Sequence, residues 1–567
     1  MRTPLVLAAV VALAACSRNT PGTFQSSTPA TGAFDVIIEN GRIVDGTGAA
    51  WFYGDVGIRG DRIAAIVPRG LLRGAHATSR IDASGLVVAP GFIDIQDQSG
   101  AQLLAGDGRQ LGKLTQGVTT GILGEGTTPA PLNPATLPAN AAEMLRRFAA
   151  PHGFGAWLDA MQAHGISQNV GSFVGAGTIR EYGMAQRMGA ASGTTLDSMR
   201  AAVGRAMEDG AFGLASALIY PPNTFASTEE LIAESKAMAP YGGLYITHMR
   251  SEADRALEAI DEVIRIASEG GVPAEIYHLK AAGTLNWAKE RAMIAKIDSA
   301  RGAGIDLQAN MYPYTAGATG LTSCLPPQYS AEGKLFDNLA SAEARSRIRQ
   351  EVLHPSSNWE NTCALSTPQG VLITDLRRPE NQQYIGKRLS EIASMKGSDY
   401  LDAAMDLILS ERTRVSTTYF MMSEDNVKLQ LQQPWMKIGT DAGGPDPDSV
   451  KALVHPRTFG NYPRILGKYV RDEHVITLED AIRKMTSAVA DRLSLADRGV
   501  LKPGMFADIV AFDPATIGDR ATYEQPKQLS VGVRHVWVNG THVIRDAVHT
   551  GARPGRALRG PGYRRTQ

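Results

Sequence analysis

The middle of the chain alternates short apolar runs with longer amphipathic stretches. It contains eight apolar runs, which read LVVAPGFIDIQ, GVTTGILGE, QNVGSFVGAG, AFGLASAL, GLYITHM, AEIYHLK, DLQANMYPY and MKIGTDA. Such runs are typical of buried strands, and several of the stretches between them have helical periodicity. In SEADRALEAIDEVIRIASEGG we expect Ser251 to cap a helix and Gly270-Gly271 to end it. Eight buried strands with crossover helices predict a (β/α)8 TIM-type barrel over residues 90–495.

Hairpin patterns stand at both ends of this central section. FDVIIENGRIVDGTG reads as two alternating strands around an Asn40-Gly41 turn, and VRHVWVNGTHVIRDAV carries Asn539-Gly540 at a similar turn. The simplest explanation is one small β-sandwich domain formed from both termini, with residues 34–89 and 496–567 as its two parts. The predicted fold class is therefore α/β, with a barrel and a terminal sandwich.

The first residues read MRTPLVLAAVVALAAC, with one positive charge before a short apolar run. This run is too short to span a bilayer and has the form of a secretory signal peptide. Its end resembles the lipobox of bacterial lipoproteins, in which the cysteine, here Cys16, carries the lipid; a plain signal peptide is the alternative. We expect a signal peptide over residues 1–16, a flexible tether over residues 17–33, and an exported protein held in the cell envelope through a lipid anchor.

The amino-acid composition limits the kinds of binding partner and cysteine chemistry that are expected. Of the 567 residues, 57 are Lys or Arg and 57 are Asp or Glu, so no bulk charge indicates nucleic-acid binding. After Cys16, only Cys324 and Cys363 remain. They can form one disulfide in an oxidising compartment, or they can be two buried small residues.

Polar residues close most of the apolar runs. In a barrel the carboxyl ends of the strands converge, and the active site lies there. Two imidazoles and two carboxylates at this end indicate a zinc site of nitrogen and oxygen ligands, although a single strand-end histidine is more often a hydrogen-bonded core residue. The run-closing residues are Gln96, Gln98, Glu125, His248, His278, Lys280, Tyr312, Tyr314 and Asp441.

These motifs resemble the amidohydrolase superfamily, and within it the N-acyl-D-amino-acid deacylases, or D-aminoacylases. The resemblance extends over residues 34–562. It implies the same architecture that the strand pattern predicts. The phrases that carry it are APGFID, QGVTT, GAFGLASALIYPPNTFASTEEL, YITHMRSE, YHLK, YPYTAGATGL, IGTDAGG, HPRTFGNYPRILGKYVR, ADRGVLKPGMFADIVAFDP and HTGARPGRALRGPGY.

The resemblance implies a tightly held zinc ion on His248, His278 and a cysteine after the second strand. Here Gly-Glu-Gly stands in the cysteine's region, so Glu125 is expected to replace the thiolate. The alternative is that Glu125 caps a turn or pairs with a basic residue. The family's second, weaker metal position uses a His-x-His pair, which is replaced here by Gln96 and Gln98. One Zn²⁺ per chain is therefore expected.

The two glutamines have several possible roles. They can hydrogen-bond a water, the substrate or Asp441, or they can be packed polar residues; Asp97 between them should point away. The resemblance makes Asp441 the proton shuttle: it accepts a proton from a metal-bound water, whose hydroxide attacks the amide, and then protonates the leaving amine.

Substrate recognition is expected to involve the free carboxylate of an N-acyl amino acid. The resemblance assigns this contact to Lys280 and Tyr312, although Lys280 can also be a structural counter-ion. Arg250, His455 and Arg457 are further candidates for anion contacts.

The predicted function is metal-dependent hydrolysis of an N-acyl-D-amino acid or a related amide, with a small molecule as the only partner. Two other hypotheses remain open. One is a related metal hydrolase that acts on a D-dipeptide or a cyclic amide. The other is a ligand-binding protein that lost catalysis with the histidine pair. A Ser-His-Asp hydrolase is disfavoured, because the chain has no G-x-S-x-G motif.

Overall fold

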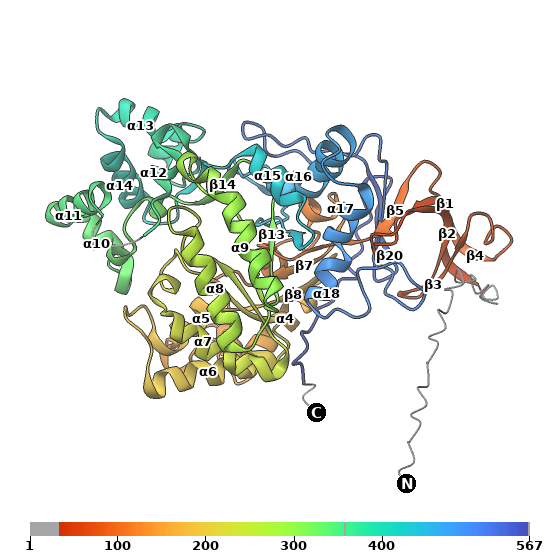
Figure 1. Cartoon of the computed structure of the whole chain (residues 1–567), viewed down its shortest axis with the longest axis horizontal. Helices are drawn as coiled ribbons and strands as arrows, with labels where there is room; N and C mark the ends of the chain where they lie inside the picture. The colour runs from red at the N-terminus through yellow and green to blue at the C-terminus, as the bar shows by residue number, and fades with distance from the viewer. Residues whose placement is uncertain (1–32, 356–358, 565–567) are drawn as a thin grey trace, which may run out of the picture.

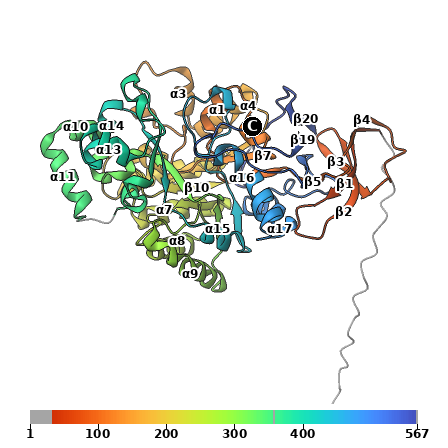
Figure 2. The same cartoon turned by 90° about the horizontal axis from the view of Figure 1, so that it is seen from above.

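The computed structural model describes residues 33–355 and 359–564, which fold around a central barrel (Figure 1). The predicted signal peptide, Cys16 and nearly all of the tether lie outside this part of the chain. In both Figure 1 and Figure 2, helices α10–α14 lie at one end of the molecule and strands β1–β4 at the other. None of the helices in the described ranges is long and apolar enough to cross a bilayer.

The eight predicted apolar runs form the barrel strands, in the predicted order. The runs are almost fully buried because helices cover their outer faces, which explains why they do not alternate with polar residues. The third strand is interrupted at Phe173, and a parallel bridge between Asp97 and Ala442 joins the first run to the last. The strands are β6 (Phe92–Asp94), β7 (Val118–Leu123), β8 (Asn169–Ser172), β9 (Val174–Gly175), β10 (Gly213–Ala217), β11 (Leu244–His248), β12 (Ala274–Ile276), β13 (Leu307–Met311) and β17 (Met436–Ile438).

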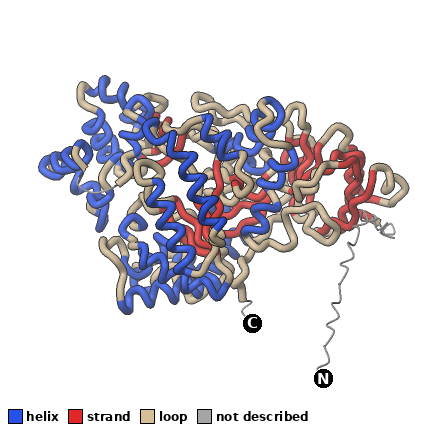
Figure 3. Tube along the Cα trace, viewed as in Figure 1, coloured by secondary structure: helices blue, strands red, loops and turns tan. Residues whose placement is uncertain are grey.

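Helices surround these strands, as the colouring by secondary structure shows (Figure 3). The predicted helix after the fifth strand starts at Ala256 rather than at Ser251, whose hydroxyl accepts the backbone N–H groups of Ala253 and Arg255 in a preceding turn. It ends at Gly270, and Gly271 takes the left-handed conformation. The helices are α1 (Gly100–Ala105), α2 (Leu111–Leu114), α3 (Glu143–Phe148), α4 (Gly153–His164), α5 (Ala176–Met184), α6 (Gly193–Glu208), α7 (Thr228–Met238), α8 (Ala256–Gly270), α9 (Glu290–Gly302), α15 (Glu424–Leu431), α16 (Arg457–Arg464), α17 (Leu478–Met485) and α18 (Ser487–Arg492).

Both ends of the chain form one nine-stranded sheet. It forks at β1, which pairs with β4 along its first half and with β5 at its end. Asn539-Gly540 forms the predicted hairpin turn, but the prediction at Asn40-Gly41 was wrong, because β1 continues through these residues and only its register shifts. The strands are β1 (Phe34–Ile43), β2 (Phe52–Arg59), β3 (Arg62–Pro68), β4 (Ala77–Asp82), β5 (Val87–Pro90), β18 (Ile509–Phe512), β19 (Val533–Val538), β20 (Thr541–Arg545) and β21 (Val548–His549).

A long insertion between β13 and α15 has its own small sheet and its own hydrophobic core. It returns to the barrel next to the carboxyl ends of the strands. Cys324 and Cys363 form a disulfide within it, which decides between the two possibilities that the sequence left open. Its elements are β14 (Ala316–Gly320), α10 (Leu335–Ala340), α11 (Ala342–Leu353), α12 (Thr362–Ser366), β15 (Val371–Asp375), α13 (Leu389–Lys396), α14 (Tyr400–Glu411) and β16 (Ser416–Phe420).

We predict that the double variant Cys324→Ser/Cys363→Ser lowers the free energy of unfolding by about 2–4 kcal/mol. The bond joins residues 39 positions apart and therefore restricts the unfolded chain. Denaturant unfolding of the oxidised wild type and the double variant measures the difference. An unchanged midpoint would show that this bond does not stabilise the insertion.

Candidate metal centre and active site

The carboxyl ends of the barrel strands open into a pocket of about 690 Å³. His248 is the last residue of β11, and Glu125, His278 and Asp441 follow β7, β12 and β17 by two or three residues. The insertion lines the other side of the pocket. The structure thus brings together side chains from four strands that are far apart in the sequence, at the end of the barrel where the sequence analysis expected them.

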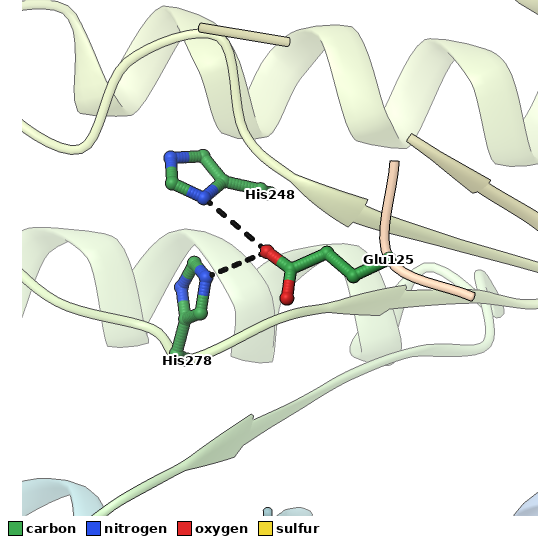
Figure 4. A group of neighbouring side chains, drawn as sticks. All are labelled: Glu125, His248 and His278. Carbon is green, nitrogen blue, oxygen red and sulfur yellow. Dashed lines mark hydrogen bonds and ion pairs between the residues drawn. The ribbon is translucent and has the colours of Figure 1, made fainter. Parts of the chain in front are cut away.

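Glu125, His248 and His278 converge on one point (Figure 4). Glu125 Oε1 lies 3.2 Å from His278 Nε2 and 3.5 Å from His248 Nδ1. Ligand atoms bound to zinc at about 2.0–2.1 Å in tetrahedral geometry lie about 3.3 Å from one another. The donor set and its spacing therefore fit one zinc ion, at a place where all three residues line the pocket.

The backbone around these residues is unusual. Gly124 and Gly126, which flank Glu125, have φ of +116° and +69°, and a Cβ at Gly124 would lie 2.4 Å from the carbonyl oxygen of Phe173. His278 has φ of +34°, although it is not glycine. Strained conformations of this kind persist where the surrounding fold enforces them, often at functional sites.

Gln96 and Gln98 hold the second oxygen of Glu125. The Nε2 atom of each glutamine donates to Glu125 Oε2 at 2.7 Å, and Gln98 Nε2 also lies 3.5 Å from Asp441 Oδ1. Asp97 points the other way and bonds Ser99 and Gln168, as the alternation of a strand predicts. The glutamines thus leave Glu125 Oε1 directed at the two histidines.

The charged groups in this cluster shift one another's pKa values. Burial disfavours a charged Glu125, but hydrogen bonds with His248 and His278 outweigh burial and hold the pKa of Glu125 well below its usual range. Burial and the Lys280 charge lower the pKa of His278, but Glu252 and Glu125 outweigh them and raise it to about 9. Glu125 is therefore held as a carboxylate, the form in which it can bind a cation.

Asp441 is paired with Arg457 at the wall of the pocket. Arg457 Nη1 lies 2.8 Å from Asp441 Oδ2, and its guanidinium lies over the ring of Tyr312, 4.5 Å from the centroid. Burial raises the pKa of Asp441 above its ordinary value, and the positive charge of Arg457 opposes this rise. Asp441 itself has φ of +48°, a second strained position in the site.

We predict that Arg457→Met moves the acid limb of the kcat/KM profile to higher pH by about 1–3 pH units, because removing the cation lets the pKa of Asp441 rise further. Activity that needs ionised Asp441 is present above this pKa and is lost as the pH falls through it. Measuring kcat/KM against pH for wild type and Arg457→Met checks the direction of this shift. An acid limb that stays in place or moves to lower pH would show that it does not report the ionisation of Asp441.

Lys280 and Tyr312 both line the pocket, where the sequence analysis placed them. Lys280 Nζ lies 2.6 Å from Glu252 Oε1 and 2.7 Å from His278 Nδ1, so it makes the counter-ion contact that is the alternative to a substrate role. Two further candidates have structural partners. Arg250 bonds Glu262, and His455 Nε2 bonds the carbonyl oxygen of Ala316.

Two acidic residues beside the histidines were not predicted from the sequence. Glu252 Oε1 lies 2.9 Å from His278 Nδ1, and Glu360 Oε2 accepts the backbone N–H of Glu252 at 2.6 Å. Glu252 could have been predicted from the sequence, because it is an acidic residue only four positions after the strand-end His248. Glu360 could not, since it belongs to the insertion, which contributes no predicted strand or run-closing residue.

A barrel that presents two histidines and carboxylates at its strand ends is typical of metal-dependent hydrolases of the amidohydrolase type. Residues 373–544 match the model of the amidohydrolase family. The chain is 34% identical to a D-aminoacylase of Alcaligenes xylosoxydans xylosoxydans over 533 residues, 93% of this chain and 97% of the relative. An N-acyl-D-glutamate deacylase of the same organism is 34% identical over 529 residues, 93% and 96% of the two chains.

Solved structures of similar proteins lead to the same family. A crystal structure of D-aminoacylase matches with a TM-score of 0.77 and 34% identity over 93% of this chain and all of that chain. An N-acyl-D-glutamate deacylase from Bordetella bronchiseptica, complexed with zinc and a phosphonate inhibitor, matches with a TM-score of 0.77 and 33% identity over the same shares. The chain belongs to the D-aminoacylase family of the amidohydrolases.

Proposed function

We propose that this protein hydrolyses the amide bond of N-acyl-D-amino acids with a single zinc ion held by Glu125, His248 and His278. The observation that carries this proposal is the convergence of these three side chains, at ligand spacing, on the pocket that also contains Asp441. The characterised relatives support the substrate class, since they are a D-aminoacylase and deacylases of N-acyl-D-glutamate and N-acyl-D-aspartate.

Held by Glu125, His248 and His278, a zinc ion would supply Lewis acidity and would lower the pKa of water toward about 7. The protein's own groups move the proton. Asp441, ionised, accepts a proton from the attacking water and then gives it to the leaving nitrogen. Arg457 orients Asp441 through their contact of 2.8 Å. One divalent ion suffices for this chemistry, so the Gln96 and Gln98 replacements are compatible with catalysis.

The substrate's free carboxylate needs a cationic partner in the pocket. Two of the pocket's cations lie near the ring of Tyr312, with Lys280 Nζ 5.7 Å and the guanidinium of Arg457 4.5 Å from the ring centroid. We assign the carboxylate contact to Lys280 and Tyr312, which form one wall of the pocket near the histidines. This contact fixes the orientation of the amide toward Asp441.

A panel of N-acetyl-D- and N-acetyl-L-amino acids tests the proposal, with amine release as the readout on the zinc-loaded protein. We expect hydrolysis of at least one D substrate and little or none of its L enantiomer. Activity on D-dipeptides or cyclic amides alone would assign a different substrate class. No hydrolysis of any member of these classes would favour a binding protein on the same scaffold.

We also propose that Cys16 anchors the protein in the cell envelope. The lipobox-like LAAC sequence supports this, and a disulfide fits an exported protein. Mass spectrometry of the mature N-terminus should find a lipidated cysteine, and Cys16→Ser should release the protein from membranes. A cleaved, unmodified N-terminus beyond Cys16 would contradict the anchor.

A further inference from the structure

A single buried carboxylate lies behind both histidines of the proposed metal site. Glu252, in the loop between β11 and α8, is 2% exposed. Its Oε1 lies 2.9 Å from His278 Nδ1, and its Oε2 lies 3.7 Å from His248 Nε2. These are the ring nitrogens on the side away from Glu125, whose Oε1 faces the other nitrogen of each ring.

Glu252 is itself fixed from three sides. Its backbone N–H donates to Glu360 Oε2 at 2.6 Å, and its carbonyl accepts the N–H of Ala282 at 2.7 Å. Lys280 Nζ donates to Oε1 at 2.6 Å and neutralises the carboxylate. The loop after the fifth strand is thereby tied to the loop after the sixth and to the insertion.

A histidine that binds a metal usually donates its second N–H to a carboxylate, carbonyl or water, which fixes the tautomer and the orientation of the ring. We propose that Glu252 is a positioning residue for both rings, those of His248 and His278. It lies 2.9 Å from His278 Nδ1, a nitrogen that Lys280 Nζ also approaches at 2.7 Å. It lies 3.7 Å from His248 Nε2, a charge contact longer than a hydrogen bond. The inference rests on the proposed function in one respect, that these two histidines hold the metal. It adds that one carboxylate sets the geometry of two ligands on neighbouring strands.

An alternative is that Glu252 binds an ion itself, because His248, Glu252 and Glu360 can also group around one point. The contacts favour the positioning role. Lys280 already supplies a cation at 2.6 Å from Glu252. An ion at this second point would also require His248 to bind metal through both ring nitrogens at once.

The test is the affinity for Zn²⁺, measured on the full chain by competition with a chelating dye, for wild type and Glu252→Gln. We expect the variant to bind one ion 10- to 100-fold more weakly, the usual cost of losing such a carboxylate. Glu258→Gln, an exposed change on α8, should bind like wild type. Circular dichroism of the metal-free proteins checks folding.

Glu252→Asp provides a second variant in case Glu252→Gln does not fold. It keeps a charge opposite Lys280 but is one methylene too short to reach both rings, so we expect weaker Zn²⁺ binding by a smaller factor. Unchanged affinity in the folded variants would overturn the positioning role, and so would two ions in wild type with one lost in Glu252→Gln. The assay uses no substrate, so its result is independent of whether the protein is a deacylase. A wild type that binds no Zn²⁺ would overturn both the positioning role and the proposed zinc-dependent function.

Discussion

Asp441→Asn should lower kcat by about 10²- to 10⁴-fold, the usual contribution of a positioned general base and acid. The amide keeps the size of the side chain and a group that can face Arg457, but it cannot accept the proton of the attacking water. The zinc content should stay at the wild-type value, because Asp441 is not one of the three converging ligands. Steady-state kinetics on the best N-acetyl-D-amino acid, with metal analysis of the same samples, measure both.

Asp448→Asn is the matched control for this prediction. Asp448 is exposed in the loop that follows β17, the strand that precedes Asp441, and it should leave kcat unchanged. A kcat for Asp441→Asn within tenfold of wild type would remove Asp441 from the proton transfer. Loss of zinc together with activity would show instead that Asp441 is a ligand.

Lys113→Met should lower the free energy of unfolding by about 3–5 kcal/mol, because it leaves a buried carboxylate without its partner. Lys113, on α2, and Asp94, at the end of β6, are both fully buried and lie 2.6 Å apart. Lys113 Nζ also donates to Thr440 Oγ1 and, at 2.7 Å, to the carbonyl oxygen of Ala442. It therefore holds the two residues on either side of Asp441.

Denaturant unfolding measures this loss, with Lys334→Met as the control, since Lys334 is well exposed and pairs with a neighbouring carboxylate at the surface. We also expect kcat to fall in Lys113→Met, because the strained backbone at Asp441 loses its support. A change in stability below 1 kcal/mol would show that Asp94 finds another partner.

The sequence predicted the barrel well because its strands are buried on both faces and recur as apolar runs. Each run that ends in a polar residue delivers that residue to the same face of the fold, so Glu125, His248, His278 and Asp441 could be grouped without a structure. The Asn539-Gly540 turn was predicted equally well. At Asn40-Gly41 the same dipeptide lies inside β1, because the pairing with β2 continues past it with a shifted register.

Contacts that depend on side-chain direction could not be predicted. Gln96 and Gln98 were recognised as departures from a histidine pair, but nothing in their spacing shows that both amides donate to Glu125. Glu360 reaches the site only through the folding of the insertion, which has its own core. The three departures from the family pattern, two glutamines and one glutamate, form one hydrogen-bonded unit.

Zinc content tests the central claim most directly. Mass spectrometry of the protein without residues 1–32 should find one zinc ion per chain in wild type and none in Glu125→Ala. That result would establish a single-metal site in which a carboxylate takes the place of the thiolate. Wild type without metal after incubation with zinc would contradict the metal centre, and zinc retained in Glu125→Ala would contradict Glu125 as its third ligand.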